Sequence, residues 1–283
     1  MSTLGLLALA QANLTAAANA LPLHNERAQP TDLELVGLLQ GVPEGESRFI
    51  RHADLLELPT QELRVELEFF PNERRTSTVV FLSDLRKALP LKDECDLLIV
   101  HCKDRYYSFY TNALIAEYKP FVLLQIDGEG PENWPKSPGG VDFGPYYVTA
   151  STEIAPHFHD LFYYPSKMPW GGVKLEAANY ADTFRPIYSG RFANLDPQAQ
   201  RGRFIYQNNC MNCHHWEDTS FGGQLAERNF VVLASHARYN KAYFFKYTKT
   251  PKQVNPASKM SANPHLTQAD LEALRAFMST YFP

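Results

Sequence analysis

The residues best suited to chemistry in this sequence are two cysteines and a histidine near residue 210. Cys210, Met211, Asn212, Cys213 and His214 form a C-x-x-C-H pattern, which is the attachment pattern for c-type haem. The two thiols add to the haem vinyl groups as thioethers, and the adjacent imidazole ligates the iron. A redox dithiol or half of a zinc site needs no histidine directly after the second cysteine, and no second cysteine pair exists for zinc. The pattern predicts one covalent haem c.

Two helices frame this motif in the sequence. Asp196-Pro197 is a helix start, with the acid at the N-cap and proline at the first helical position, and the helix is expected to run to about Asn208. Thr267 to Met278 has the apolar spacing of an amphipathic helix with Thr267 as its N-cap. The residues between are rich in loops. We therefore expect residues 195–283 to form a separate, all-α domain.

Residues 195–283 resemble a class I cytochrome c domain. The helix that carries Gly202, Phe204 and Tyr206 is similar to the first helix of that family. The resemblance implies a second axial ligand from a methionine in a loop before the last helix, where this chain has Met260 within Ser258-Lys259-Met260-Ser261. A thioether ligand favours ferrous iron and raises the reduction potential, which suits an electron carrier.

Other side chains compete for these roles, and one family feature differs. His236 and His265 are alternative sixth ligands and would give a haem of lower potential. The family usually has Gly-Pro-x-Leu after the motif, where a backbone carbonyl orients the proximal imidazole. This chain has Gly222-Gly223-Gln224-Leu225 instead, so the sequence does not assign that hydrogen bond.

The preceding part of the chain alternates between apolar runs and irregular segments. Strands are expected at Leu33–Leu39, Leu63–Phe69, Asp96–Cys102 and Phe121–Ile126, and short helices at His52–Leu56 and at Asp84–Leu89 with Ser83 as the N-cap. Strands with short helices and long connections predict a β-rich α+β domain over residues 30–185.

Four segments carry a family resemblance by their order along the chain: Val79 to Leu85, Lys103 to Tyr106, Phe121 to Leu124 with Asp127-Gly128, and Gly144 to Val148. On these segments, residues 30–185 resemble the sulfite-oxidase-type molybdopterin-binding domain. That family binds molybdenum through a cysteine thiolate after the second strand, but the matching segment, Glu68 to Arg75, contains no cysteine. We therefore expect a domain without molybdenum cofactor that serves as a docking or assembly module.

Three other groups of residues invite a functional interpretation. If Leu97 to Val100 is a strand, Cys95 and Cys102 lie about 23 Å apart, too far for a disulfide, and both are expected to be structural free thiols. His157-x-His159 has no third ligand nearby, which favours a surface or structural role over a metal site. The aromatic run from Tyr106 to Tyr110 is expected to be the buried edge of the β-rich domain.

The N-terminus resembles an export signal. Residues 1–20 are apolar and end in Ala18-Asn19-Ala20, a small-x-small pattern typical of a signal-peptidase site, although the usual basic start is missing. A disordered tail is the alternative. No later segment reaches 18 consecutive apolar residues, so no transmembrane segment is expected in the mature chain.

The charges are unevenly distributed along the chain. From Gly190 onward there are 11 Lys/Arg and 6 Asp/Glu, a balance of +5, whereas the first 189 residues have 16 and 25, a balance of −9. Lys246, Lys249, Lys252 and Lys259 lie near Met260 in the sequence and are expected to steer an acidic partner.

The sequence as a whole predicts a periplasmic electron carrier or electron-transfer subunit rather than an enzyme. Its partners would be redox proteins, with a dehydrogenase or membrane complex as donor and a cytochrome or oxidase as acceptor, and no nucleic acid is expected. A haem–molybdenum oxidoreductase of the sulfite-oxidising type and a cytochrome c subunit of a larger respiratory complex are the alternatives.

Overall fold

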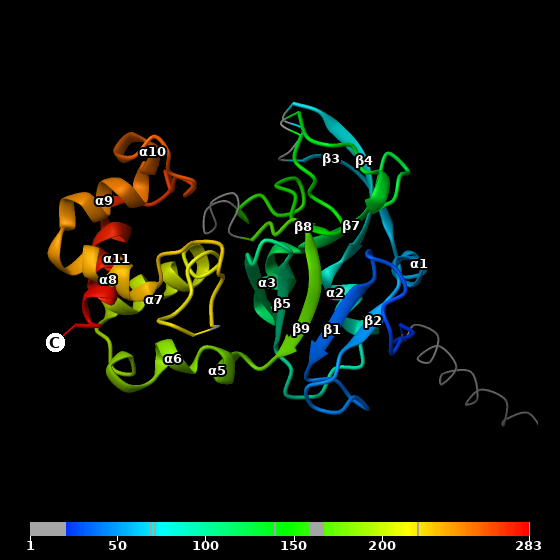
Figure 1. Ribbon diagram of the computed structural model, residues 1–283, viewed down its shortest axis with the longest axis horizontal. Helices are drawn as coiled ribbons and strands as arrows, with labels where there is room; N and C mark the ends of the chain where they lie inside the picture. Colours follow the sequence, from blue (N-terminus) through cyan, green and yellow to red (C-terminus); the bar gives the residue numbers. More distant parts are fainter. Residues whose placement is uncertain are drawn as a thin grey trace, which may run out of the picture.

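The chain folds into a β-rich part followed by a helical part. The computed structural model describes residues 21–67, 70, 72–138, 140–158, 167–219 and 221–282. Figure 1 shows the strands on one side, the C-terminal helices on the other, and the short helices α5 and α6 between them. Among the described residues, no helix is both long enough and apolar enough to cross a membrane.

Two sheets build the β-rich part. The five-stranded sheet has the order β2-β1-β9-β5-β6, and the four-stranded sheet has the order β3-β4-β7-β8. The strands are β1 (Leu33–Gly37), β2 (Arg48–Ile50), β3 (Gln61–Glu66), β4 (Arg74–Phe81), β5 (Leu97–Cys102), β6 (Tyr107–Thr111), β7 (Phe121–Ile126), β8 (Tyr147–Thr149) and β9 (Gly172–Ala178). The helices are α1 (His52–Leu56), α2 (Leu82–Ala88) and α3 (Asn112–Tyr118), with a 3-10 turn, η1 (Pro131–Asn133).

The five-stranded sheet is buried on both faces at β5. Leu98 and Val100 point into the core between the two sheets, whereas Leu97 and Ile99 belong to a second core that they share with the helical part. Successive side chains of a strand point to opposite faces, so a continuous apolar run such as Leu97–Val100 is what a sheet covered on both sides requires.

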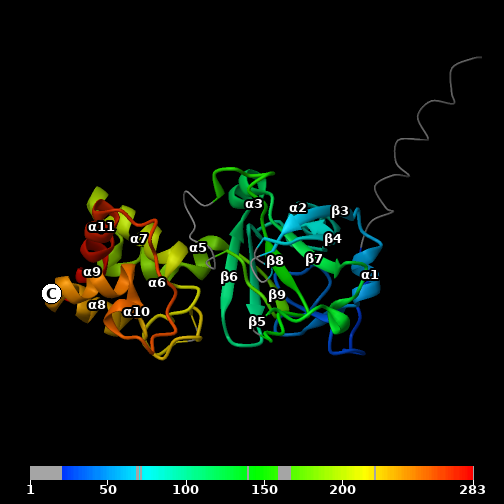
Figure 2. The same cartoon turned by 90° about the horizontal axis from the view of Figure 1, so that it is seen from above.

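A packed connection joins the two parts. It consists of α5 (Tyr180–Thr183), α6 (Arg185–Tyr188) and the 3-10 turn η2 (Gly190–Phe192). Phe184 and Ile187 are fully buried in the shared core, and the Phe184 ring meets the Phe109 ring of β6 edge to face at 4.8 Å. In Figure 2, β5 and β6 lie on the side of the β-rich part that faces the helices. The connection therefore fixes the two parts against each other.

The helical part contains α7 (Pro197–Asn209), α8 (Phe230–Tyr239), α9 (Lys241–Lys249), α10 (Pro251–Val254) and α11 (Gln268–Ser279). Helices α7 and α11 cross in contact at Gly202, where an added Cβ would lie 1.9 Å from the backbone oxygen of Ala273. Only glycine allows the two backbones to approach this closely.

The helix starts predicted in this part are confirmed. The Asp196 side chain accepts a hydrogen bond from the Ala199 backbone N–H at 2.8 Å. Thr267 accepts from Asp270 N, and the Asp270 carboxylate accepts in return from the Thr267 backbone, which completes a capping box.

Three predictions in the β-rich part are wrong in detail. Helix α2 begins at Leu82 with Phe81 at its N-cap, so Ser83 lies inside the helix and does not cap it. Strand β1 ends at Gly37, before the predicted Leu39, because Gly37 has a φ of +93° and an added Cβ would lie 2.1 Å from the Ala177 oxygen. The chain turns there against the neighbouring strand β9. Strand β3 runs from Gln61 to Glu66, so the predicted strand Leu63–Phe69 extends too far: Leu67 lies beyond the strand, and residues 68 and 69 lie outside the described residues.

Candidate haem site

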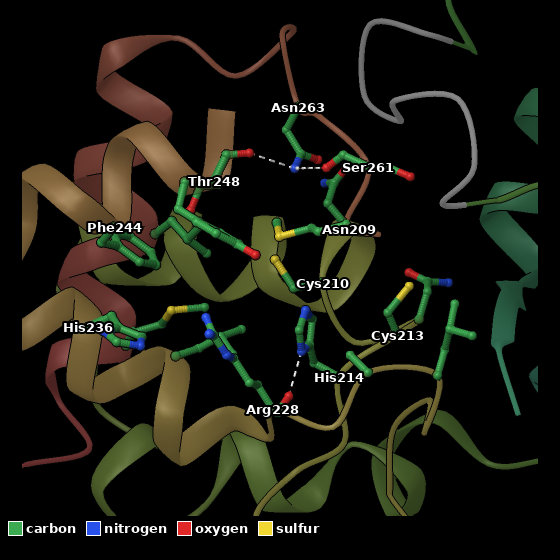
Figure 3. Close-up of a pocket in the computed structure, with 18 of the residues that line it drawn as sticks. Asn209, Cys210, Cys213, His214, Arg228, His236, Phe244, Thr248, Ser261 and Asn263 are labelled. Atoms are coloured by element: carbon green, nitrogen blue, oxygen red, sulfur yellow. Dashed lines mark hydrogen bonds between the residues drawn. The ribbon is translucent and has the colours of Figure 1, made fainter. Parts of the chain in front are cut away.

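A cavity of about 340 Å³ lies between the attachment motif and helices α8, α9 and α11. Figure 3 shows the motif on one side of it and Phe244 and His236 on the other. Four predicted residues line it together: Cys210, Cys213, His214 and Met260. The remaining lining residues are Tyr106, Asn209, Asn212, Leu225, Ala226, Arg228, Leu233, His236, Tyr243, Phe244, Tyr247, Thr248, Lys259, Ser261, Asn263, Leu274 and Met278.

Helix α7 ends at the first cysteine of the motif and places it at the cavity. Cys210 is the C-cap residue, and its backbone oxygen accepts from Cys213 N at 3.1 Å and from His214 N at 3.0 Å. This tight turn sets both thiols and the imidazole on the same wall. Burial raises the pKa of each thiol to about 12, so both are protonated, neutral groups near neutral pH. Met211, by contrast, is fully buried in the shared core.

The imidazole of His214 is held by a backbone carbonyl. Its Nδ1 lies 2.6 Å from the Arg228 oxygen, which assigns the proton to Nδ1 and leaves Nε2 as the ring atom for a metal. Burial lowers the pKa of His214, which also favours the neutral, ligating form. The orienting carbonyl that the sequence did not assign thus comes from Arg228, just before α8.

Gly222 and Gly223 do not orient the imidazole; they allow a close contact between two backbone segments. An added Cβ on Gly223 would lie 1.8 Å from the Asn212 oxygen, and Gly222 has a φ of +101°. Gly223 N donates to the Met211 oxygen at 2.7 Å. The glycines allow the following loop to pass directly against the attachment motif.

The loop that carries Met260 is fixed to α9. The Ser258 hydroxyl lies 2.9 Å from the Tyr247 hydroxyl and accepts from Met260 N at 3.2 Å. Asn263 donates to the Thr248 oxygen at 3.0 Å. Of the two alternative ligands, His236 lines the same cavity and His265 does not.

The exposed rim of the cavity carries two cationic side chains and one apolar side chain. Arg228, Lys259 and Ser261 are exposed, and Leu225 is 49% exposed. The Arg228 guanidinium donates to the Tyr243 hydroxyl at 3.3 Å. Lys246 and Lys252 are also exposed, on α9 and α10.

This donor set fits a c-type haem. Two thiols, an imidazole with a free Nε2, and a thioether line one cavity with largely apolar walls. Cys210 and Cys213 would hold the haem covalently, and His214 and Met260 carry donor atoms that could bind its iron. The bound group would supply one-electron chemistry at iron.

One cavity residue comes from the β-rich part and was not predicted as part of the site. Tyr106, at the end of the turn before β6, is 8% exposed and lines the cavity with Cys213. The sequence marks it only as the start of an aromatic run and as the end of the segment Lys103 to Tyr106 that resembles a turn of the sulfite-oxidase-type domain. Because this contact joins residues about a hundred positions apart, no local pattern could have found it.

The other predicted residues lie away from the cavity. Cys95 and Cys102 are buried and form no disulfide, as predicted. His157 is exposed in a turn, and His159 lies outside the described residues, as do Glu68, Phe69 and Pro71 of the segment expected at the molybdenum position. Within the described part of the chain, no three His, Cys, Asp or Glu side chains are grouped as a metal site.

Comparison with known proteins identifies the helical part. Residues 199–281 match the cytochrome c family model, and no curated protein matches the chain. The C-terminal part is therefore a cytochrome c domain, which implies covalent haem c and supports a haem-based electron-transfer role. The match does not extend to the β-rich part, whose resemblance to sulfite-oxidase-type domains stays a prediction.

Proposed function

We propose that this protein is an exported carrier of single electrons that holds one covalent haem between His214 and Met260. The observation that carries the proposal is the shared cavity, in which the attachment cysteines, the imidazole and the thioether meet. A His/Met-ligated haem has a relatively high reduction potential, which suits exchange with other redox proteins. Export is proposed from the signal-like residues 1–20.

The protein residues have distinct tasks in this proposal. Arg228, through its backbone oxygen, keeps the His214 ring in the orientation and tautomer needed for iron. Ser258 holds the methionine loop against α9. Apolar walls such as Phe244 and Leu274 exclude water from the cavity, so the environment of the iron stays nearly constant when its charge changes.

The cationic rim supports an acidic redox partner. Lys246, Lys249, Lys252 and Lys259 follow one another along α9, α10 and the methionine loop, and Lys259 lines the cavity itself. Long-range attraction by such a group accelerates encounter at low ionic strength and is screened at high salt. Reversing these four charges turns the attraction into repulsion, so the rate of electron transfer to an acidic partner is expected to rise with salt instead of falling. An unchanged salt dependence would refute the steering role.

The ligand assignment is tested with two variants. Met260→Ala is expected to lower the reduction potential and to open the sixth position to an added ligand, because the thioether is lost. His236→Ala is the matched control, since this side chain lines the same cavity. Visible spectra and a redox titration measure both. If His236→Ala opens the sixth position to an added ligand and Met260→Ala does not, the distal ligand is His236.

The proposal of a carrier rather than a molybdenum enzyme is tested by metal analysis. One iron and no molybdenum per chain in the purified holoprotein would support a carrier whose β-rich part is a docking or assembly module. Stoichiometric molybdenum would contradict it and support the sulfite-oxidising type of enzyme instead.

A further inference from the structure

The turn between β5 and β6 has a fixed shape. Cys102 N donates to the Tyr106 oxygen at 2.8 Å, and the Asp104 carboxylate accepts from Tyr106 N at 2.9 Å. Arg105 between them has a φ of +70°. These contacts make a tight hairpin turn, Cys102 to Tyr106, at the end of the five-stranded sheet that faces the cytochrome c domain.

This turn is hydrogen-bonded to the haem-attachment segment. Tyr107 N donates to the Asn212 backbone oxygen at 3.2 Å, and the Asn212 side-chain amide donates to the Tyr107 oxygen at 2.9 Å. On the other side of the turn, Gln224 N donates to the Arg105 oxygen at 2.9 Å. The β-rich domain therefore contacts both the motif and the glycine loop that follows it.

Apolar packing supports these hydrogen bonds. Leu97, Ile99, Tyr107 and Phe109 on one face of the sheet share a buried core with Met211 of the motif. A contact that combines a common apolar core with buried hydrogen bonds is more rigid than the polar interfaces between domains that move. The β-rich domain is thus a fixed neighbour of the haem site.

Tyr106 forms part of the cavity wall on this side. It lines the cavity together with Cys213 and is almost completely buried, and burial raises the pKa of its hydroxyl well above the usual value. The exposed lining residues, Leu225, Arg228, Lys259 and Ser261, belong to the other parts of the rim.

We propose that Tyr106 is a shielding residue by which the β-rich domain covers the Cys213 side of the haem pocket and keeps water and redox partners from the group that would be bound there. The inference rests on the haem proposed above. In this inference the β-rich domain forms one wall of the haem pocket. Partners must then exchange electrons through the rim at Leu225 and Lys259.

The test compares variants of the full-length holoprotein. Tyr106→Ala removes the ring, Tyr106→Phe keeps it, and Tyr239→Ala removes a tyrosine that is 71% exposed on α8 and does not line the cavity. Two quantities are measured: the second-order rate constant for reduction by a small neutral hydroquinone, and the midpoint potential. Circular dichroism and thermal unfolding verify folding, and Tyr106→Val replaces the alanine variant if that variant does not fold.

Removing the Tyr106 ring is expected to expose this side of the haem pocket and so to raise the rate constant for reduction of Tyr106→Ala about threefold or more. The midpoint potential is expected to fall, because water stabilises the more charged ferric state. Tyr106→Phe and Tyr239→Ala are expected to match the wild type. A folded Tyr106→Ala with unchanged rate and potential would overturn this inference alone. A wild-type chain without covalent haem would overturn the proposed function and this inference with it.

Discussion

Gly202 allows helices α7 and α11 to touch, so its replacement by alanine is expected to force them apart. The added Cβ would lie 1.9 Å from the Ala273 oxygen and 2.8 Å from the Phe277 Cβ. Ordinary contact begins near 3.4 Å, so the backbones must separate by the difference, about 1.5 Å, or distort. A backbone oxygen cannot rotate away as a side chain would.

The energetic cost follows from two opposing effects. Overpacking of this kind costs about 3 kcal/mol or more when backbone must move, while alanine gains about 1 kcal/mol over glycine within a helix. The net expectation is a loss of about 2–3 kcal/mol in the free energy of unfolding. For a chain of 283 residues, with an unfolding entropy of about 2.1 cal/mol/K per residue, that corresponds to a fall of about 3–5 °C in Tm.

Thermal unfolding of the holoprotein, followed by circular dichroism, measures the effect. Gln198→Ala is the control, because Gln198 is an exposed residue of the same helix, and it is expected to leave Tm nearly unchanged. A Tm for Gly202→Ala equal to or above that of the wild type would mean that helix propensity outweighs the crossing contact, and the reasoning would be refuted.

Three further substitutions test contacts elsewhere. Gly223→Ala puts a Cβ 1.8 Å from the Asn212 oxygen, so the yield of holoprotein is expected to fall sharply; a wild-type yield would contradict the close approach. The hydrogen bond from His101 lowers the pKa of Glu176 below its ordinary 4.5, so its stabilisation is present above that pH and is lost as the pH falls below it. The advantage of wild type over Glu176→Gln in chemical denaturation, about 0.5 kcal/mol at pH 7, is therefore expected to vanish near pH 3, and an advantage that persists there would argue against a stabilising hydrogen bond between His101 and the Glu176 carboxylate. Asp270→Asn weakens the start of α11 and is expected to cost about 1 kcal/mol in thermal unfolding; no loss would show that the capping box contributes little.

The elements that the sequence predicted well are those specified by local chemistry. Asp196-Pro197 and Thr267 start helices through hydrogen bonds within three residues, and both starts are where the sequence predicts them. The apolar run Phe121–Ile126 is β7 with the predicted bounds. In each case the signal and the structure that it specifies lie within a few residues of each other.

The contacts that complete the haem site depend on distant residues and were not predictable in this way. The Arg228 carbonyl reaches His214 because the glycine loop folds back on the motif, and any residue type could supply that oxygen. Tyr106 joins the cavity only after the sheet packs on the cytochrome c domain. Ser83 illustrates the converse: its side chain could cap a helix, but strand β4 leads directly into α2, which begins two residues before the predicted start at Asp84.

The most direct test of the central claim is the intact mass of the purified protein after denaturation. Covalent attachment at Cys210 and Cys213 predicts a mass equal to that of the polypeptide plus one haem, and the Cys210→Ala, Cys213→Ala double variant should lose this addition. A wild-type polypeptide mass without haem, from cells that attach haem to other c-type cytochromes, would contradict the account.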